Sequence, residues 1–593
     1  MNSPLLVSSL DSRQIRRLPG AAIARLVVRL AAITVVAAMV AAGPAIGPGR
    51  ACAQSTPAPN ADVQIGPSPG LQPASGEREV LEAGATLEQL ARANFGDLND
   101  AELKLVHAAP RRALLWVGPN NDVTSAANDP SNASQWPPSR TIRAALLRWL
   151  VADPQARPYV HPSGIGIGGA VIDGQLDLSY LTLDAPLTII SSAIPGGIDF
   201  SFAHLQGLDL ARDVTGPITG DRATIAGDLQ LTGGTYGPIS GDRVAITGDL
   251  QLVGGDYGPV SLFRAEIGGS LDCSDGRFVG GPDPLSIVEA TIKGDASFNN
   301  GFSTSGVVDL TLAQIGRGLS FKDAHFIGAG VNGLNADRAT IDGTFYWDSI
   351  ARTPGTELNL TNARAAALWD DAASWPATGN LFIDNFVYGD ISGGPTDARV
   401  RLSWLARQPP GYRPQPYGQL AKVMRERGSD VGAVDVMMAK EKARRNQGGL
   451  GWGERLWSRV LDVTIGYGYR PMRALWWIFF FVALGWVLFG LGYHERAITP
   501  TEPEAYDCFI KNGEPPRHYP PFNAIVYSLE NFLPIVDLHQ GAYWRPNPRH
   551  GTGGRIRALS GTLLRWYLWV HILAGWIITP LLAAGLTGLV RPD

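Results

Sequence analysis

The sequence predicts a mainly β protein: a β-helix or β-solenoid with coils of about 21–26 residues, flanked by α-helical caps and followed by a C-terminal two-helix transmembrane hairpin. The first observation is the phrase Ile-x-Gly-x-Leu-x-Leu, which recurs, with some variation, eight times between Ile172 and Trp347. The second is a Gly-Pro pair that recurs every 21 residues, and the third is a pair of long apolar segments near the C-terminus. A repeat of this length indicates a solenoid, because each coil buries its apolar residues only against its neighbours.

Residues 1–53 have the composition of a secretory signal peptide. Several Arg residues precede an apolar run from Leu30 to Ala42, and the segment ends in Ala51-Cys52-Ala53. Thirteen apolar residues are fewer than the ~20 that span a bilayer. We therefore expect cleavage after Ala53; an uncleaved anchor and a misassigned start are the alternatives. A lipoprotein signal at Cys52 fits badly with the preceding Gly49-Arg50.

Two segments lead from this signal to the repeats. Residues 54–78 are rich in Pro, Ser, Ala and Gly and are predicted to be a disordered linker. Residues 79–163 are predicted to be a helical cap, with amphipathic helices over Ala101–Pro110 and Arg140–Val151. We expect this cap to cover the first coil, since an exposed strand edge would recruit other chains.

Residues 164–395 are the predicted β-solenoid. Apolar and polar residues alternate after the Gly of each copy, as at Leu229 and Leu231, which predicts a short strand with one buried face. Gly stands two places after the Ile in seven of eight copies, so we expect a corner that only a residue without a side chain fits. The Gly-Pro pairs, such as Gly216-Pro217, predict a second corner. Twenty-one residues divide as 5, 5, 5 and 6, which predicts four short faces in each of about nine or ten coils.

Charge is divided unevenly along the chain. Residues 54–395 hold 20 Lys and Arg against 38 Asp and Glu, a net charge of 20 − 38 = −18. Residues 396–475 hold 15 basic against 7 acidic residues, a net charge of 15 − 7 = +8. An acidic solenoid argues against nucleic acid as its ligand. The three cysteines, Cys52, Cys273 and Cys508, form neither a disulfide framework nor a metal-binding spacing.

Residues 396–473 are a predicted basic helical collar, and residues 474–593 are a predicted transmembrane domain. Ala474–Tyr493 and Trp566–Val590 are long and apolar enough to span a bilayer. Between them, residues 522–538 place apolar side chains on one face of an amphipathic helix, which would lie in the membrane interface or enter it as a re-entrant segment. Two topology signals conflict here. The signal peptide places the solenoid in the periplasm, whereas the basic collar favours the cytoplasm by the positive-inside rule. We favour the signal peptide.

Some motifs have both a functional and a structural interpretation. Val463–Gly468 (VTIGYG) matches the potassium-filter pattern, but it precedes the first spanning helix instead of lying between the two, so we favour an interfacial turn. A non-selective or vestigial pore is the alternative. Two Gly-x-Gly-x-x-Gly runs, which start at Gly164 and Gly328, lack the strand-then-helix context of a dinucleotide site and are predicted to be turns.

Acidic and histidine side chains are the other candidates for a site. Asp228, Asp249 and Asp295 recur once in each coil and, with Arg222, Arg243 and Arg264, could line a catalytic groove like that of β-helix polysaccharide lyases. Repetition favours a structural role, because every coil needs a corner while an active site is needed once. His204, His325, His571 and Asp537 stand alone; among them His571 is notable because it lies inside a spanning segment. We assign no catalytic, cofactor-binding or metal-binding residue.

Taken together, several motifs resemble an uncharacterised group of bacterial membrane proteins with degenerate pentapeptide-like or β-helix repeats and a two-helix membrane domain. The likeness covers residues from about 95 to the C-terminus and rests on the repeats and four other motifs. These are RTIRAALLRWL from Arg140, PQPYGQLA from Pro414, GYGYRP from Gly466 and AGLTG from Ala584. Some members of this group are labelled membrane-associated oxidoreductases. The chain has no flavin, nicotinamide, haem or thiol-pair motif, so that activity is not carried over and no cofactor is predicted.

We therefore expect a membrane-anchored β-solenoid that serves as a binding or scaffold protein of the bacterial cell envelope, without catalysis. The expected place is the bacterial inner membrane, with the solenoid in the periplasm. The expected partners are the phospholipid bilayer and an envelope glycan or envelope protein, and no nucleic acid; the oligomeric state is left open. The alternatives are a polysaccharide-active β-helix enzyme, which needs a non-repeated cluster of Asp, Arg or Lys on one coil face, and a pore or transport protein.

Overall fold

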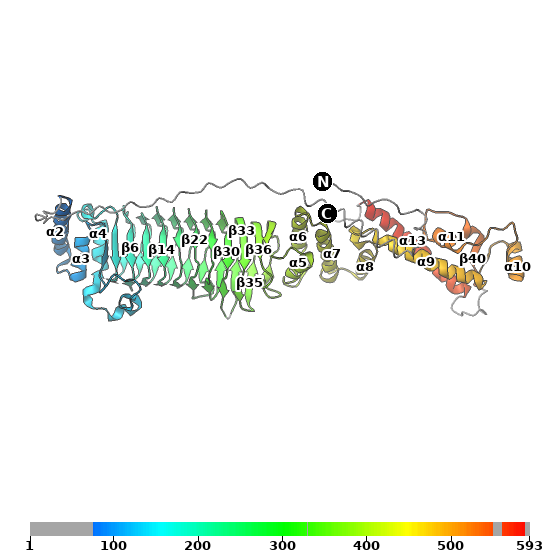
Figure 1. Ribbon diagram of the computed structural model, residues 1–593, viewed down its shortest axis with the longest axis horizontal. Helices are drawn as coiled ribbons and strands as arrows, with labels where there is room; N and C mark the ends of the chain where they lie inside the picture. The colour runs from blue at the N-terminus through cyan, green and yellow to red at the C-terminus, as the bar shows by residue number, and fades with distance from the viewer. Residues whose placement is uncertain (1–74, 329, 549–559, 588–593) are drawn as a thin grey trace, which may run out of the picture. The chain divides into compact units, whose positions relative to one another are not determined.

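A computed structural model describes residues 75–587 of the chain, apart from residue 329 and residues 549–559. The predicted signal peptide (1–53) and the predicted linker up to residue 74 lie outside the described residues. The predicted β-solenoid is confirmed: parallel strands stack coil upon coil in three sheets, two of which hold ten strands each (Figure 1).

A single coil shows how the repeat folds. β13 (Thr224–Ile225) and β14 (Leu229–Thr232) belong to the largest sheet, and β15 (Thr235–Tyr236) and β16 (Ile239–Ser240) belong to the two others. Each pairs in parallel with the strand at the same position in the next coil, so that Leu229 lies beside Leu250. The four predicted strand positions are therefore present, but two of them share one sheet.

The strands of the solenoid occupy three columns. The largest sheet contains β1 (Leu114–Trp116), β3 (Ile165–Gly168), β6 (Leu187–Ile190), β9 (His204–Leu205), β10 (Leu208–Ala211), β13, β14, β17 (Ala245–Ile246), β18 (Leu250–Gln251), β21 (Glu266–Ile267), β22 (Leu271–Asp272), β25 (Thr291–Ile292), β26 (Ala296–Ser297), β29 (Gln314–Ile315), β30 (Leu319–Lys322), β33 (Thr340–Asp348), β36 (Arg364–Asp370) and β38 (Val387–Gly393). The second contains β2 (Thr141–Arg143), β4 (Val171–Asp173), β7 (Ala193–Ile194), β11 (Val214–Thr215), β15, β19 (Asp256–Tyr257), β23 (Arg277–Phe278), β27 (Ser303–Thr304), β31 (His325–Phe326) and β34 (Ala351–Arg352). The third contains β5 (Leu176–Asp177), β8 (Ile198–Asp199), β12 (Ile218–Thr219), β16, β20 (Val260–Ser261), β24 (Leu285–Ser286), β28 (Val307–Asp309), β32 (Asn332–Asn335), β35 (Thr356–Asn359) and β37 (Leu381–Phe382).

The core of the solenoid is a stack of like side chains. Because the register places equivalent residues over one another, Tyr236 stacks on Tyr257 with ring centroids 5.2 Å apart, and Tyr257 stacks on Phe278 at 4.7 Å. Cys273 is buried at a core position, as its place in the repeat predicts. Each coil therefore completes its hydrophobic burial only with its neighbours on both sides.

The structure confirms that the corner after the Ile of each repeat needs Gly, and it shows the physical reason. A Cβ added at Gly248 would lie 2.1 Å from Asp228 Oδ1 and 2.8 Å from the Gly227 carbonyl oxygen of the previous coil. Close approach of successive coils therefore excludes a side chain there. The left-handed corner is elsewhere and carries ordinary residues: Arg222 and Arg243 have φ angles of 58° and 60°.

The N-terminal cap adds both helices and strands. It contains α2 (Ser75–Phe95), α3 (Asp100–Ala108), α4 (Ala144–Ala152) and the 3₁₀ turns η2 (Ala126–Asn128), η3 (Pro130–Gln135), η4 (Pro138–Arg140) and η5 (Arg157–Tyr159). α2 starts inside the segment expected to be a linker. The helix expected from Arg140 starts only at Ala144, because Thr141–Arg143 pairs as β2 with β4 and extends a sheet. The first coil is thus covered partly by added strands and partly by α4, which packs on β5.

The C-terminal end of the solenoid meets the collar helices α5 (Ala398–Leu405) and α6 (Pro414–Glu426). Gln419 Nε2 in α6 donates to the Tyr388 carbonyl oxygen at 2.6 Å, and Gln415 Nε2 donates to that of Phe386 at 3.1 Å. These side chains satisfy carbonyl groups of the last coil, which would otherwise form an open edge.

The remaining elements form the collar and the candidate membrane domain. They are α7 (Asp430–Gln447), α8 (Trp452–Ile465), η6 (Gly466–Gly468), α9 (Arg473–His494), β39 (Ile498–Pro500), α10 (Pro503–Asn512), α11 (Ala524–Phe532), α12 (Gln540–Tyr543), β40 (Trp544–Pro546) and α13 (Gly561–Leu586). α9 and α13 are long and apolar enough to cross a membrane. In the most apolar 18-residue stretch of each helix, only 17% and 22% of the residues, respectively, are buried. Such exposure is unlike the core helix of a soluble protein and fits contact with lipid.

α11 occupies the amphipathic segment predicted over 522–538. It packs against both α9 and α13, and its residues Tyr527, Ser528 and Phe532 are buried. This part of the segment therefore joins a three-helix contact, while Ile525 and Ile535 are exposed.

Candidate functional site

A polar cleft on one face of the solenoid is the candidate site. Its volume is about 410 Å³. One wall is the loop over residues 123–131, and the other is the surface of β11, β15 and β19. The polar and charged side chains in its lining are those of Thr124, Ser125, Asp129, Ser131, Arg212, Asp213, Thr235 and Asp256. This cleft therefore breaks the regularity of an otherwise repetitive surface.

Two buried side chains hold the loop that forms the wall. Asn128 Nδ2 donates to the carbonyl oxygens of Asn120 and Asp122 at 2.9 and 3.0 Å. Arg140 donates to the carbonyl oxygen of Gly169, at 2.8 Å, and to that of Ala127, at 2.9 Å. The loop is thus tied both to itself and to the first coil, and the wall of the cleft is prearranged.

The floor of the cleft departs from the repeat. Arg212 and Asp213 stand where the next two coils have Gly233-Gly234 and Gly254-Gly255. Arg212 has a φ angle of 59°, close to the 65° and 66° of Gly233 and Gly254. An Arg in the left-handed region costs about 1–2 kcal/mol relative to the right-handed one. The next two coils have Gly at this position, but Ser191 in the preceding coil and Asp275 in a later coil have φ angles of 48° and 57°, so Arg212 stands apart by its positive charge and not by its backbone.

Asp213 is the most unusual group in the cleft. Its side chain is fully buried, and Oδ1 accepts a hydrogen bond of 2.7 Å from the Ser192 backbone N–H. Among the described residues, Oδ2 has no hydrogen-bond partner, and buried polar atoms of Ser191, Asp209 and Thr215 also lack one. Burial raises the pKa of Asp213 well above its usual value, against the Ser192 hydrogen bond, and the nearby Asp209 raises it further. A raised pKa favours the neutral acid, which can donate as well as accept a hydrogen bond.

The rim of the cleft carries charges of both signs. Hydrogen bonds from Ser131 lower the pKa of Asp129, and the Arg212 guanidinium lowers it further. Asp256 pairs with Arg277 at 3.3 Å. Arg212 is exposed and forms no ion pair within the described part of the chain. Hydroxyl groups, carboxylates and one free guanidinium suit a small polar ligand with several hydroxyl groups.

The repeated acids, by contrast, have structural partners. Asp228 Oδ1 accepts from the Asp249 N–H at 2.9 Å, and Asp249 Oδ1 accepts from the Ser270 N–H at 2.7 Å. Asp295 Oδ1 accepts from the Gly318 N–H at 2.8 Å. Each carboxylate thus links its coil to the next, which confirms the structural interpretation of this ladder.

The repeated arginines lie on the left-handed corners. Arg264 pairs with Glu289 of the next coil at 2.5 Å, and the Arg222 guanidinium lies 5.5 Å from the Phe202 ring centre. Their recorded partners are therefore residues of adjacent coils, and they do not join the acid ladder in a groove.

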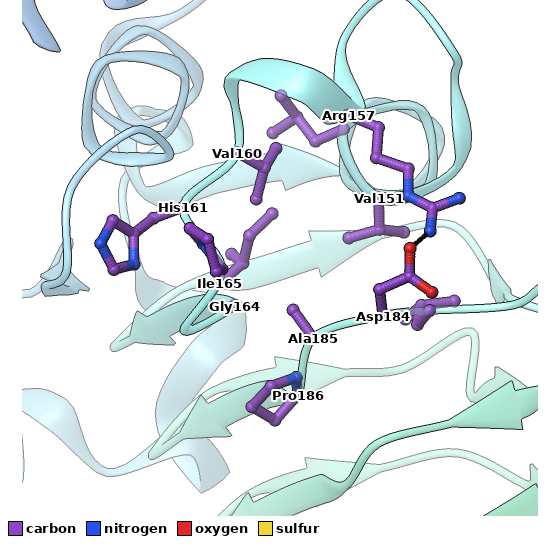
Figure 2. Close-up of a pocket in the computed structure, with 12 residues that line it drawn as sticks. Val151, Arg157, Val160, His161, Gly164, Ile165, Asp184, Ala185 and Pro186 are labelled. Carbon is purple, nitrogen blue, oxygen red and sulfur yellow. Dashed lines mark ion pairs between the residues drawn. The ribbon is translucent and has the colours of Figure 1, made fainter.

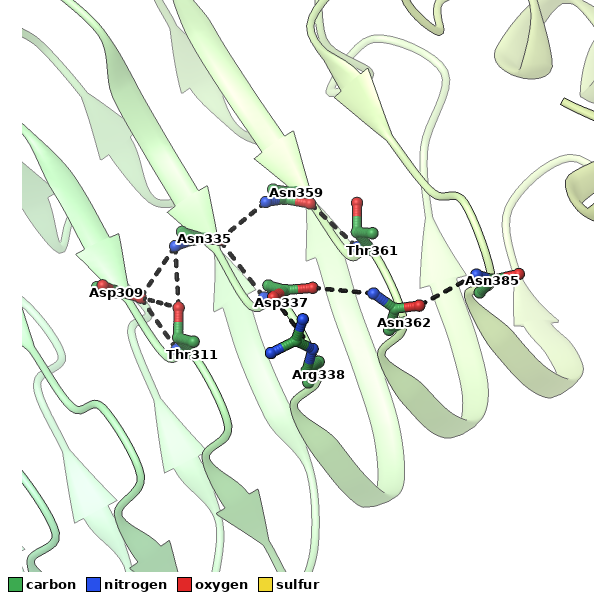
Figure 3. A network of polar contacts seen from close by, with 9 residues as sticks. All are labelled: Asp309, Thr311, Asn335, Asp337, Arg338, Asn359, Thr361, Asn362 and Asn385. Atoms are coloured by element: carbon green, nitrogen blue, oxygen red, sulfur yellow. Dashed lines mark hydrogen bonds and ion pairs between the residues drawn. The ribbon is translucent and has the colours of Figure 1, made fainter. Parts of the chain in front are cut away.

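A further polar ladder follows the last coils (Figure 3). Asn335 donates to Asp309 at 3.1 Å, and Asn359 donates to Asn335 at 2.9 Å. Beside it, Asn362 donates to Asp337 at 3.3 Å. Amides that stack in register satisfy one another along the axis, so this network stabilises the solenoid and offers few free groups.

Of the single histidines, His204 and His325 are exposed on β9 and β31. In the described residues no three His, Cys, Asp or Glu side chains gather closely enough to hold a metal ion. Asp537 is exposed and pairs with His539 at 3.2 Å.

His571 lies in a polar contact between helices. It is buried on α13, its Nε2 lies 3.0 Å from the Ser528 carbonyl oxygen, and its Nδ1 lies 3.2 Å from the Tyr567 hydroxyl. This contact joins α11 to α13, so its evident role is to hold the short helix in place.

The filter-like motif forms a turn. Thr464 and Ile465 end α8, and Gly466, Tyr467 and Gly468 all have positive φ angles. The Tyr467 hydroxyl accepts a hydrogen bond of 2.9 Å from Arg445. The motif therefore links the collar to α9, as its place in the sequence predicts.

One of the two Gly-rich runs is a strand, which corrects the predicted turn. Gly166 and Gly168 lie in β3. A Cβ at Gly168 would lie 2.2 Å from the Trp116 ring, so glycine leaves room for that ring in the neighbouring strand β1. The run that starts at Gly328 includes residue 329, which lies outside the described residues.

A second cavity of about 220 Å³ lies under the N-terminal cap (Figure 2). Val151, Val160 and Ile165 give it an apolar lining, and Arg157 pairs with Asp184 at its edge. The His161 ring points away from this ion pair. The cavity offers few polar groups to a ligand.

Arg212 and Asp213 are functional candidates that the sequence patterns did not predict. The available signal is the charged pair Arg212-Asp213, because the preceding coil has Ser191-Ser192 at these positions and the next two coils have Gly pairs. Asp129 could not be found this way, since only the fold brings the 123–131 loop to this coil. No protein-family model, curated protein or solved structure matches the chain.

Proposed function

We propose that this protein is a membrane-anchored β-solenoid of the bacterial cell envelope that binds an envelope glycan in the cleft at Arg212. α9 and α13 would anchor it in the inner membrane, and the solenoid would lie in the periplasm after removal of residues 1–53. The two candidate spans and their low burial support the anchor. The composition of residues 1–53 supports the compartment.

The observation that carries the ligand proposal is the cleft. Arg212 places an exposed guanidinium next to a buried acid where the next two coils have the pairs Gly233-Gly234 and Gly254-Gly255. Ser191 and Asp275, at the same position of other coils, share its left-handed φ angle, so the positive charge and not the conformation sets Arg212 apart. Glycans carry hydroxyl and amide groups that match carboxylates, Ser and Thr hydroxyls and a guanidinium. The net negative charge of the solenoid disfavours a polyanion.

The test is binding of soluble envelope glycan fragments, both muropeptides and core oligosaccharides, to the full chain in lipid nanodiscs. Arg212→Gly should weaken binding by about tenfold or more, since it removes a charge-assisted contact. The matched control is Arg243→Gly, because Arg243 is an exposed Arg with a φ angle of 60° that lies outside the cleft.

Equal binding by wild type and Arg212→Gly would overturn the assignment of the cleft. The same mixtures should be examined for shortened glycans. Products that disappear in Arg212→Gly would favour the polysaccharide-active enzyme over the scaffold. Reporter fusions at Pro395, within residues 494–561 and after Asp593 test the compartment separately. Cytoplasmic activity at Pro395 would contradict the periplasmic placement.

A further inference from the structure

α8 presents an apolar face that the rest of the described chain leaves uncovered. Trp452, Leu456 and Val463 are 83%, 51% and 55% exposed. Their spacing of four and seven residues places them on one side of the helix. Arg455 and Arg459 lie on the same side and are exposed. Exposed Trp and Leu side chains with Arg beside them suit the membrane interface, where Trp is enriched and the Arg stem lies along apolar surface while its charged head reaches the headgroups.

This helix borders an apolar groove. The groove has a volume of about 370 Å³ and lies between α8, α9 and α13. Its walls include Val460, Trp477, Phe481 and Ile577, and Arg459 is the single charged residue that lines it. Trp477 Nε1 donates to the Val463 carbonyl oxygen at 3.1 Å, which joins α8 to α9. The groove is thus a long apolar surface with one cation at its edge.

Some of the other cations of the collar pair with carboxylates. Arg445 pairs with Asp462 at 3.0 Å, and Arg470 pairs with Asp435 at 2.6 Å. Lys442 also lies 3.8 Å from Asp462. Arg459 forms no ion pair in the described part of the chain. Lys440, Arg455 and Arg473 also form no ion pair among the described residues, but of these cations only Arg459 lines the apolar groove, where an anionic ligand with a hydrocarbon chain would contact both the guanidinium and the apolar walls.

We propose that this groove binds one acyl chain of an anionic glycerophospholipid, with the lipid phosphate against Arg459 and α8 in the membrane interface. Guanidinium groups bind phosphate through charge-assisted hydrogen bonds, and a chain in the groove would cover walls that water would otherwise wet. Continuity with α9, which starts eight residues after α8 ends, places the groove at membrane level. This inference rests on the membrane anchor of the proposed function but not on the glycan cleft.

The test uses the full chain purified in detergent, depleted of lipid and titrated with phosphatidylglycerol or phosphatidylcholine, with bound lipid counted by native mass spectrometry. Wild type should bind one phosphatidylglycerol about tenfold more tightly than phosphatidylcholine. Arg459→Gln should abolish that preference. Ala574→Phe, which fills the groove without a change of charge, should lower the affinity for both lipids.

Lys440→Gln on α7 is the charge-matched control and should bind like wild type, since Lys440 does not line the groove. Circular dichroism and gel filtration confirm that each variant is folded. Inorganic phosphate in excess should not displace the lipid, because the chain supplies part of the affinity. Unchanged binding in both Arg459→Gln and Ala574→Phe would overturn the proposal. If Arg459→Gln weakened lipid binding and Ala574→Phe did not, the lipid would be held by attraction to the surface charge, and binding in the groove would be ruled out. Recovery of the chain in the soluble fraction without detergent would contradict the anchor itself.

Discussion

Arg401 and Asp370 form a bidentate ion pair that is buried at the junction of the solenoid and the collar. The Arg401 guanidinium nitrogens Nη1 and Nη2 lie 2.8 and 2.6 Å from the two Asp370 oxygens, and the side chains are 0% and 3% exposed. Trp375 Nε1 donates to Asp370 Oδ2 at 2.8 Å, and Arg401 Nε donates to the Pro395 carbonyl oxygen at 2.6 Å. Each nitrogen of the Arg401 guanidinium and each oxygen of the Asp370 carboxylate thus has a hydrogen-bond partner, and the pair links β36 to α5.

Removal of either partner should strongly destabilise this junction. Arg401→Ala leaves an unpaired carboxylate in the protein interior, and the expected loss is about 3–5 kcal/mol. Hydrogen exchange measured over β38 and α5, together with thermal unfolding of the full chain, checks this. Arg399→Ala is the control, since Arg399 is an exposed residue of the same helix and should change stability by less than ~0.5 kcal/mol. Equal protection in the two variants would argue against a structural role for the pair.

The close approach of coils predicts a penalty for a methyl group at Gly248. A Cβ would lie 2.8 Å from the Gly227 carbonyl oxygen, which is backbone and cannot move freely. We expect Gly248→Ala to destabilise the solenoid by about 1–3 kcal/mol. Gly254→Ala has more space, because its nearest atom is 3.9 Å away, but it places Ala at a φ of 66°. It should cost about 1–2 kcal/mol, through the backbone alone. Thermal unfolding compares the two, and a neutral Gly248→Ala would contradict the packing argument.

Relief of strain is expected at Arg243. Its φ angle of 60° is unfavourable for residues with a side chain but not for Gly. Arg243→Gly should stabilise the solenoid by up to about 1 kcal/mol, because the gain exceeds the entropy that Gly loses on folding. A rise in the unfolding temperature is the readout. A fall would show that contacts of the Arg243 side chain outweigh the strain.

The buried acid Asp213 predicts a particular dependence on pH. Its pKa is raised in the folded state, so the folded protein holds a proton that the unfolded chain releases. Stability should therefore fall as pH rises from about the unfolded pKa of 3.9 towards the folded value. Asp213→Asn removes this dependence, and its advantage over wild type should grow with pH. Unfolding temperatures between pH 4 and pH 8 check this.

Asp371 gives a contrast of opposite sign. Although burial raises its pKa, hydrogen bonds from the Ser374 side chain and from the Ser349 and Ser374 amides lower it to about 2. Asp371→Asn should therefore destabilise the protein most at neutral pH, and the stability that the carboxylate contributes is lost as pH falls towards about 2. Parallel pH profiles for Asp213→Asn and Asp371→Asn would contradict at least one of the two assignments.

The close contact of α11 with α13 predicts that a larger side chain at Gly575 destabilises the packing of these helices. A Cβ there would lie 1.8 Å from the Phe532 carbonyl oxygen. Gly575→Leu should therefore displace α11 and lower the unfolding temperature in detergent. Gly490→Ala is the control, because its nearest contact, at 3.6 Å to Ala524, is an ordinary one. Equal behaviour of the two variants would show that α11 does not depend on this contact.

Local sequence patterns are sufficient to predict the solenoid and the two apolar helices. The signals are local: apolar residues alternate at Leu229 and Leu231, Gly-Pro pairs recur at a fixed spacing, and α9 is a long uncharged segment. Each pattern is formed by residues that are close together in the sequence. The structural role of Asp228 and its equivalents also followed from repetition alone. The helix predicted from Arg140 is wrong at Thr141–Arg143. A short apolar segment suits a helix or a strand, and here pairing with the neighbouring strand β4 makes it a strand.

The positions of the cleft and of the apolar groove depend on tertiary contacts. Asp129 and Arg212 are 83 residues apart in the chain, and the cleft exists because Asn128 and Arg140 hold a loop against a later coil. The groove at Arg459 likewise needs three helices from distant segments. Periodicity records which residues are buried within each coil. It does not record which loop crosses which coil, because that depends on contacts between residues far apart in sequence.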